Sequence, residues 1–274
     1  MTPDVDVNGA QLYLGDCLPV LASLETGSVY LILTGPPYNV SATGVGGRAN
    51  TKIGKVKTKT GHRSVRRDFG AWDYEWDPRP FLAEAARVLR TGGALVSFVS
   101  EFTLPAFVAS ELDHRSMLYW HKTNPTPSFR GFPQRAVEQI VWQTRGGHWT
   151  FRRGGAWPNL IEAPTAGSGE RYTRLDDETG AMVTLHPTQK PITLMRELVD
   201  VFSEPGGLIL DPYMGTGTTV RAALDLGRRA IGCELDPLYF PVAAVRASQT
   251  VMPMLDFGFP GSPILVLARE LWDQ

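Results

Sequence analysis

The sequence predicts an α/β fold in which a mostly parallel sheet carries helices on both faces. Two observations support this fold class. Short apolar segments alternate with segments of helical periodicity along most of the chain. A glycine-rich turn, Gly215-Thr216-Gly217, joins one apolar segment directly to a helical one, as in open sheets that bind ligands at the carboxyl ends of their strands. A chain of 274 residues with 43% hydrophobic residues suits one such domain with an insertion.

The predicted elements follow in chain order. Strands are predicted at residues 11–14, 29–34, 94–99, 117–121, 137–143, 208–210 and 230–233. Helices are predicted at residues 81–89, 104–112, 192–202, 218–226 and 238–248, and Gly92-Gly93 is expected to end the first of them. Residues 144–185 lose periodicity and indicate a loop-rich insertion. The tail at 251–274 fits either an extra strand and helix or an arm that packs on a second subunit.

Composition narrows the function classes. A formal net charge of -1 excludes a generally basic coat for nucleic acid, but it allows a basic patch on one face. Cys17 and Cys233, the two cysteines, lie far apart and outside metal-ligand spacing, so neither a disulfide framework nor a zinc site is expected. The N-terminal residues lack the apolar core of a signal peptide, and no apolar run reaches the ~20 residues of a membrane span. We therefore expect a soluble cytoplasmic protein.

The glycine loop is the first candidate ligand site. Glycines let a ligand approach the main chain, and the helix that follows favours an anionic group at its N-terminus. Further along, a second predicted strand ends in Glu234, an acid that can accept both hydroxyls of an adenosine ribose. By themselves these features fit either a dinucleotide enzyme or a glycine-rich turn beside an exposed acid. The residues of the loop that we expect to bind the ligand are Asp211, Pro212, Gly215, Gly217 and Thr218.

Two further motifs narrow the ligand. The run His186-Pro187-Thr188-Gln189-Lys190-Pro191 precedes a predicted helix, and Gly232-Cys233-Glu234-Leu235-Asp236-Pro237 surrounds the acid. With the run from Asp211 to Gly217, they resemble the DNA amino-methyltransferases, which methylate adenine N6 or cytosine N4. The resemblance implies S-adenosylmethionine as the cofactor.

The resemblance also assigns roles around the cofactor. It places Glu234 at the ribose, with Asp236 in the same motif. Gly15-Asp16-Cys17-Leu18 matches the family segment that meets the adenine ring, although Asp16 equally fits a helix N-cap and Cys17 a small pocket or core residue. The residues implied at the methionine end are Thr188, Gln189 and Lys190.

The segment Thr34-Gly35-Pro36-Pro37-Tyr38-Asn39 resembles the catalytic motif of the same family, which has Asp, Asn or Ser before Pro-Pro-Tyr. An exocyclic amine is a poor nucleophile because its lone pair is conjugated with the ring. The first side chain and the first proline carbonyl can accept its N–H bonds, and the tyrosine can stack on a base flipped out of the duplex. The prolines hold these groups in a stiff turn. We therefore expect the catalytic residues to be Gly35, Pro36, Pro37 and Tyr38.

Gly35 departs from that pattern because it has no side-chain acceptor. Three explanations stay open: the chain is an inactive form, the Thr34 hydroxyl or a water replaces the missing acceptor, or the Pro36 carbonyl alone supports slow turnover. Loss of one such hydrogen bond commonly raises the barrier by ~2.7–4 kcal/mol.

The motif order defines the class that the chain resembles. The catalytic motif precedes the glycine loop, as in the permuted beta class, and this order argues against protein glutamine methyltransferases. The resemblance implies a Rossmann-like methyltransferase fold with a seven-stranded sheet. Asn39 and the motif order favour adenine N6 over cytosine N4. The expected divisions are a catalytic half at 1–143, a target-recognition region at 144–185, a cofactor-binding half at 186–250 and the tail at 251–274.

The expected partner is double-stranded DNA. Residues 41–70 are rich in Lys and Arg and predict a loop that clasps DNA phosphates, although a solvated basic loop has the same composition. A homodimer and a cognate restriction enzyme are compatible with the resemblance. His121 and His186 lack a surrounding ligand cluster, so no metal is expected. The residues expected to contact DNA are Arg48, Lys52, Lys55, Lys57 and Arg63 in the basic loop, Arg130 near the flipped base, and Arg152 and Arg153 in the insertion.

Two other function classes compete with an active DNA methyltransferase. One is a DNA-binding protein that holds the cofactor but is catalytically silent because of Gly35. The other is an RNA or small-molecule methyltransferase.

Overall fold

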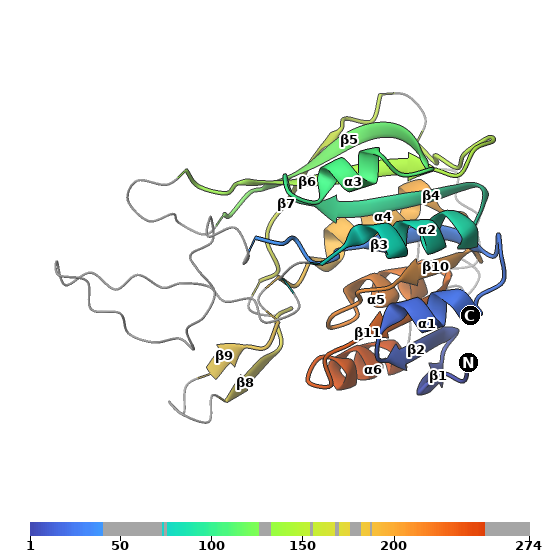
Figure 1. Cartoon of the computed structure of the whole chain (residues 1–274). Helices are drawn as coiled ribbons and strands as arrows, with labels where there is room; N and C mark the ends of the chain where they lie inside the picture. The colour runs from blue at the N-terminus through green and yellow to red at the C-terminus, as the bar shows by residue number, and fades with distance from the viewer. Residues whose placement is uncertain are drawn as a thin grey trace, which may run out of the picture.

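A nine-stranded sheet lies at the centre of the molecule, with strand order β1-β2-β11-β10-β3-β4-β6-β5-β7 (Figure 1). The computed structural model describes residues 1–40, 73, 76–125, 133–153, 156–167, 170–175, 182–186 and 188–249. The basic segment 41–70 and the tail 251–274 lie outside these residues. In the described part of the chain, no helix is long and apolar enough to cross a membrane.

Five neighbouring strands of the sheet run parallel, so their carboxyl ends share one edge. They are β2 (Ala10–Leu14), β11 (Arg229–Glu234), β10 (Leu208–Asp211), β3 (Val29–Thr34) and β4 (Leu89–Val99). The remaining strands are β1 (Val5–Val7), antiparallel to β2, then β6 (Val137–Thr144), antiparallel to β4, β5 (Asp113–Lys122), and β7 (Leu160–Ala163), parallel to β5.

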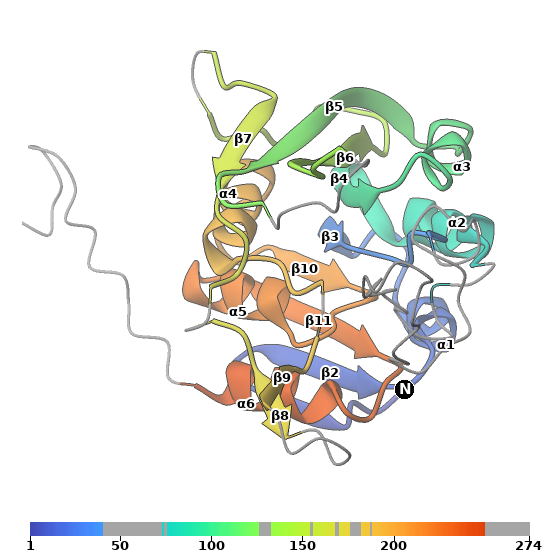
Figure 2. The same cartoon turned by 90° about the vertical axis from the view of Figure 1, so that its left-hand side faces the viewer.

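Helices cover both faces of the sheet, as Figure 2 shows in side view. One face carries α1 (Cys17–Ser23), α2 (Pro78–Val88) and α3 (Leu104–Val108), and the other carries α4 (Ile192–Phe202), α5 (Thr218–Asp225) and α6 (Phe240–Ser248). Strand β3 is buried between the two layers, which explains its continuous apolar sequence. A separate hairpin pairs β8 (Thr173–Leu175) with β9 (Met182–Thr184). The α/β fold class predicted from the sequence is confirmed.

Capping side chains fix the first helix on one face. The Asp16 carboxylate accepts a hydrogen bond from the backbone N–H of Leu18 at 3.1 Å, so α1 begins directly after β2. The helix α2 begins in the same way, because Asp77 accepts from Arg79 N and a proline occupies its first turn.

Several details differ from the sequence prediction, among them the helix α1, which was not predicted. The sheet has nine strands rather than seven, because the short edge strands β1 and β7 carry too few residues to show periodicity. The strand β7 lies inside the region predicted to be loop-rich. Gly92 and Gly93 lie within β4 rather than ending a helix: α2 ends at Val88, and Gly92 uses a φ of 75° to meet the Arg145 carbonyl. The helix predicted at 104–112 is α3 and stops at Val108.

Candidate functional site

The predicted motifs meet at the carboxyl edge of the parallel strands. Strand β3 ends at the Gly35 motif, β10 at the glycine loop, β11 at Glu234 and β2 at Asp16. Backbone contacts hold neighbouring strand ends together, since Gly15 N donates to the Glu234 carbonyl at 2.8 Å. A sheet of this kind binds its ligands at this edge.

Glu234 is directed at the glycine loop. One carboxylate oxygen accepts from Gly215 N at 2.8 Å, and the other accepts from Asp236 N at 2.7 Å. Burial raises the pKa of Glu234 to about 7, against the opposing effect of these two backbone donors. A carboxylate placed on neutral donors suits the two adjacent hydroxyls of a ribose, which are donors of the same kind. Asp236 itself caps the next turn through Leu238 N, so it shapes the loop around Glu234.

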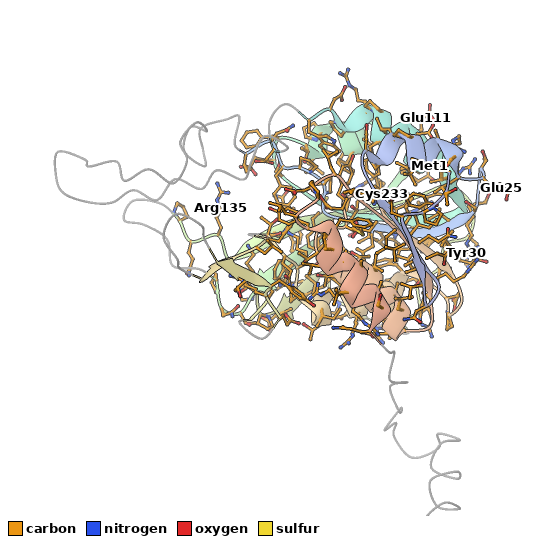
Figure 3. The ribbon with its side chains drawn as sticks, turned by 90° about the horizontal axis from the view of Figure 1, so that it is seen from below. Met1, Glu25, Tyr30, Glu111, Arg135 and Cys233 are labelled. Carbon is orange, nitrogen blue, oxygen red and sulfur yellow. The ribbon has the colours of Figure 1, made fainter. Side chains whose placement is uncertain are left out.

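The predicted adenine end lies beside α1. Asp16 is exposed and keeps acceptor capacity beyond its N-cap bond. Cys17 is buried against Tyr213, and burial raises the pKa of its thiol to about 12, as is typical of an inert structural cysteine. Cys233 is also a buried, free thiol and lies in the interior of the molecule (Figure 3). Trp76 meets Tyr213 edge to face at 5.5 Å, which gives this end an aromatic wall.

The glycine loop needs its glycines. Gly215 has a φ of 55°, and a Cβ there would lie 2.9 Å from Nε2 of His186. Gly217 has a φ of 77°, and its Cβ would meet the backbone of Ala243 at 2.9 Å. Thr218 starts α5 and turns its hydroxyl inward, where Arg246 donates to it at 2.7 Å. The backbone conformation of the loop and the side chains packed against it therefore fix its shape.

Asp211 joins the glycine loop to the catalytic strand. Its carboxylate accepts from the Thr34 hydroxyl at 2.7 Å and from Tyr213 N at 3.2 Å. Burial raises the pKa of Asp211 to about 6. Thr34 is fully buried, and its hydroxyl is engaged by Asp211. Pro212 is buried next to Asp211, so both residues support the glycine loop from its buried side.

The residues just before α4 contact two different parts of the site, the glycine loop and the catalytic turn. Gln189 is buried, donates to the Glu170 carbonyl at 2.7 Å and accepts from the Thr216 hydroxyl at 3.3 Å, so it braces the glycine loop. The Thr188 hydroxyl lies 3.5 Å from Nδ1 of His186, whose ring covers Gly215. Lys190 instead reaches the catalytic strand end.

The catalytic turn is rigidly held. Tyr38 N donates to Asp73 at 2.7 Å, and the Ser100 hydroxyl donates to the Tyr38 carbonyl at 2.6 Å. Pro36 and Pro37 are buried, whereas Gly35 and Tyr38 are partly exposed. Asn39 adopts a φ of 56° and its amide bonds both the N–H and the carbonyl of Trp76. The turn thus presents Gly35 and the Tyr38 ring at the sheet edge.

Sequence reasoning missed an ionic cluster beside this turn, formed by Glu138, Lys190, Lys122 and the Tyr38 hydroxyl. Glu138 accepts from Lys190 at 2.6 Å, from Lys122 at 2.8 Å and from the Tyr38 hydroxyl at 3.1 Å. Burial disfavours the charge on Glu138, but the two lysines together outweigh it and lower the pKa of this carboxyl to about 2. The one available signal was an acid near the start of a predicted strand.

The predicted DNA contacts fall in two groups. Arg152 pairs with Asp200 at 2.6 Å and with Glu204 at 3.3 Å, and Arg153 pairs with Asp200 at 3.5 Å. These acids lie at or just after the end of α4, at the sheet edge opposite Tyr38, so the structure does not bring the two arginines to the site. The others lie outside the described residues: Arg48, Lys52, Lys55, Lys57, Arg63 and Arg130. Within the described ranges, no group of His, Cys, Asp and Glu side chains could hold a metal ion.

Known proteins are similar to this chain in sequence. A family model described as DNA methylase, of the N6/N4 type, matches residues 29–245. The type II methyltransferase M.HinfI of Haemophilus influenzae is 28% identical over 261 residues, which cover 85% of this chain and 66% of that protein. The chain thus spans just under two thirds of the length of this relative.

Solved structures share the fold. The cytosine-N4-specific PvuII DNA methyltransferase superposes with a TM-score of 0.65 at 17% identity, covering 99% of this chain and 95% of that one. A putative DNA modification methylase of Thermus thermophilus, in complex with S-adenosylmethionine, superposes with a TM-score of 0.53 at 27% identity, covering 88% of this chain and 95% of that one.

Proposed function

Because the chain belongs to the N6/N4 family of DNA methylases, which use S-adenosylmethionine as methyl donor, we propose that it methylates the N6 amine of adenine in duplex DNA. The predicted cofactor is confirmed by this membership. The proposal itself consists of two finer statements: the methylated base is adenine, and this chain is an active enzyme.

One observation carries the proposal: a single sheet edge holds both a ribose-type acid and the Pro-Pro-Tyr turn. Glu234 and Gly215 form the cofactor side, and Tyr38 forms the base side. The buried bond between Thr34 and Asp211 fixes the distance between the two sides. A methyl donor and a flipped base bound there would have their reacting atoms preorganised, which lowers the barrier of a reaction between two bound molecules.

The choice of adenine rests on the motif order and on Asn39. In this structure Asn39 bonds the main chain of Trp76, so its influence on the base acts through the shape of the turn. Cytosine N4 is the alternative, since its amine has the same conjugated character.

Sequencing of single DNA molecules from cells that express the protein tests the proposal. We expect N6-methyladenine at one short recurring sequence. N4-methylcytosine would replace the proposal by its alternative. Purified protein with labelled S-adenosylmethionine and genomic DNA provides the second arm, and no incorporation in either arm would refute an active enzyme.

A silent DNA-binding protein is the second candidate, and Gly35 is the observation that favours it. It predicts that DNA and S-adenosylmethionine both bind in calorimetry while no methyl group is transferred. A side-by-side assay on RNA checks the remaining class, and a preference for RNA over duplex DNA would support it.

A further inference from the structure

We propose that Glu138 is the carboxylate that accepts a hydrogen bond from the target amine, in place of the side chain that Gly35 lacks. The inference rests on the proposed function, because it concerns the same base site. It assigns a catalytic role to a residue outside the Pro-Pro-Tyr motif.

The space next to Gly35 is the starting point. Gly35 is not in the left-handed region, and a Cβ there would meet Cε of Lys190 at 3.6 Å and Phe98 at 4.0 Å, which are ordinary contacts. Neither the backbone nor the packing requires glycine. The side-chain stem of Lys190 borders this space. The Lys190 ammonium group forms an ion pair with the Glu138 carboxylate, with an N–O distance of 2.6 Å.

The topology brings Glu138 to the same edge. Strand β6 runs antiparallel to β4, so its first residues lie beside the last residues of β4, with Gln139 paired to Val99. The residue before that pair, Glu138, therefore lies level with the catalytic turn. It contacts the turn directly, because the Tyr38 hydroxyl donates to it at 3.1 Å.

The carboxylate is fixed but not closed off. The Lys190 side chain is 13% exposed and the Glu138 side chain 20% exposed, so a bound base can reach the pair. A carboxylate offers about four lone-pair positions, and the described side chains Lys190, Lys122 and Tyr38 use three. The aromatic rings of Tyr38, Phe98 and Trp120 surround the Lys190 ammonium at 4.5–5.8 Å, which holds the pair in a rigid apolar frame.

An acceptor at this place accelerates the methyl transfer. The methyl sulfonium of S-adenosylmethionine supplies the methyl group: the amine nitrogen forms a bond to the methyl carbon, and the carbon–sulfur bond breaks with its electron pair left on sulfur. The methylated nitrogen then carries one proton too many. Glu138 takes this proton and passes it to water, while the Pro36 carbonyl accepts the second N–H. The carboxylate is ionised when the base binds, because the neighbouring lysines outweigh burial and keep the pKa of Glu138 low.

A set of four proteins tests the inference: wild type, Glu138→Gln, Gly35→Asp and the double variant. We expect Glu138→Gln to lower the single-turnover rate of methyl transfer by ~10²–10³, as for other lost acceptors in catalytic sites. Gly35→Asp should restore most of this loss in the Glu138→Gln background, because it returns a carboxylate beside Lys190. Glu162→Gln is the matched control: Glu162 lies on β7 at 65% exposure, and its replacement should leave the rate unchanged.

Thermal unfolding of the same four proteins gives a readout that needs no activity. In the Glu138→Gln protein, Asp at position 35 supplies the missing partner of Lys190, so it should raise Tm by about 2–4 °C relative to Gly35. In the wild-type background, Gly35→Asp adds a second negative charge beside a lysine that Glu138 already pairs. The rise in Tm should therefore be absent. Equal shifts in both backgrounds would show that positions 35 and 138 do not share Lys190.

The outcomes separate this inference from the proposed function. An active wild type with an equally active Glu138→Gln variant overturns the role of Glu138 and leaves the function intact. A wild type without transfer also overturns it. If the Gly35→Asp single variant is then active, the protein retains the methyltransferase site of its family, and the natural sequence is the catalytically silent form. If Glu138→Gln fails to fold, Glu138→Asp keeps the charge, and an unchanged rate for that shorter side chain would refute a direct contact with the amine.

Discussion

The hydroxyl of Thr34 donates a 2.7 Å hydrogen bond to the carboxylate of Asp211, and both side chains are buried between neighbouring strands. The two residues are 177 positions apart in the chain. One leads into the catalytic turn and the other into the glycine loop. This bond therefore couples the position of the base side of the site to that of the cofactor side.

The first prediction concerns the pH dependence that Asp211 gives to stability. Burial raises its pKa from 3.8 to about 6, so the native state holds the proton more tightly than the unfolded chain does. Stability contributed by the protonated form is complete below pH 4 and falls as the pH rises through 6. In Asp211→Asn this loss disappears, while the amide oxygen still accepts from Thr34. Between pH 5 and pH 7.5 the wild type should lose about 1–1.5 kcal/mol more unfolding free energy than the variant. Urea titrations measure the difference, and parallel profiles would contradict it.

Glu234 should make cofactor binding pH-dependent. Burial raises its pKa to about 7, and the ionised form is the stronger acceptor for the two ribose hydroxyls. Affinity for S-adenosylmethionine should therefore rise as the pH passes through 7 and then level off. Glu234→Gln should bind roughly 10–100-fold more weakly at pH 8 and show a flat profile. Calorimetry with S-adenosylhomocysteine between pH 6 and 8.5 checks both statements. A pH-dependent Glu234→Gln profile would place the titrating group elsewhere.

Gly215 tests the shape of the cofactor loop. Gly215→Ala forces a Cβ into a left-handed backbone 2.9 Å from His186, so it should lower stability by about 1–3 kcal/mol and weaken cofactor binding. Gly146→Ala is the matched control, because Gly146 has a φ of 53° with nothing within 4 Å of its Cβ. That variant should show only the backbone cost and normal binding. Adding His186→Ala to Gly215→Ala should recover part of the stability, and no recovery would locate the strain in the backbone alone.

The last prediction separates the two groups of basic residues expected at DNA. Replacing Lys52, Lys55 and Lys57 by Ala should weaken DNA binding and reduce the slope of log affinity against log salt by about one unit per lost phosphate contact. Arg152→Ala should leave both unchanged, because Arg152 is paired with Asp200 and Glu204 at the opposite sheet edge. Fluorescence anisotropy at several salt concentrations measures both quantities. A slope altered by Arg152→Ala would place DNA on that edge.

The sequence by itself determined the fold class, the parallel strands and the ligand motifs. These features are local: a buried strand needs a continuous apolar segment, and a tight loop needs glycine, so both can be seen in a few neighbouring residues. The predicted helix at residues 192–202 matches α4 to the residue, because its apolar spacing is strong. The short edge strands β1 and β7 were not predicted, because three or four residues are too few to show an alternating apolar pattern.

Only the tertiary structure decided how the motifs meet. The bond from Thr34 to Asp211, the placement of Lys190 beside Gly35 and the pairing of Lys190 with Glu138 all join residues more than 50 positions apart. No local pattern marks such pairs, because their free energy arises from burial and proximity that exist only after the sheet has assembled. The structure likewise turned Arg152 away from the site, since an arginine pairs with whichever acids the fold puts within reach.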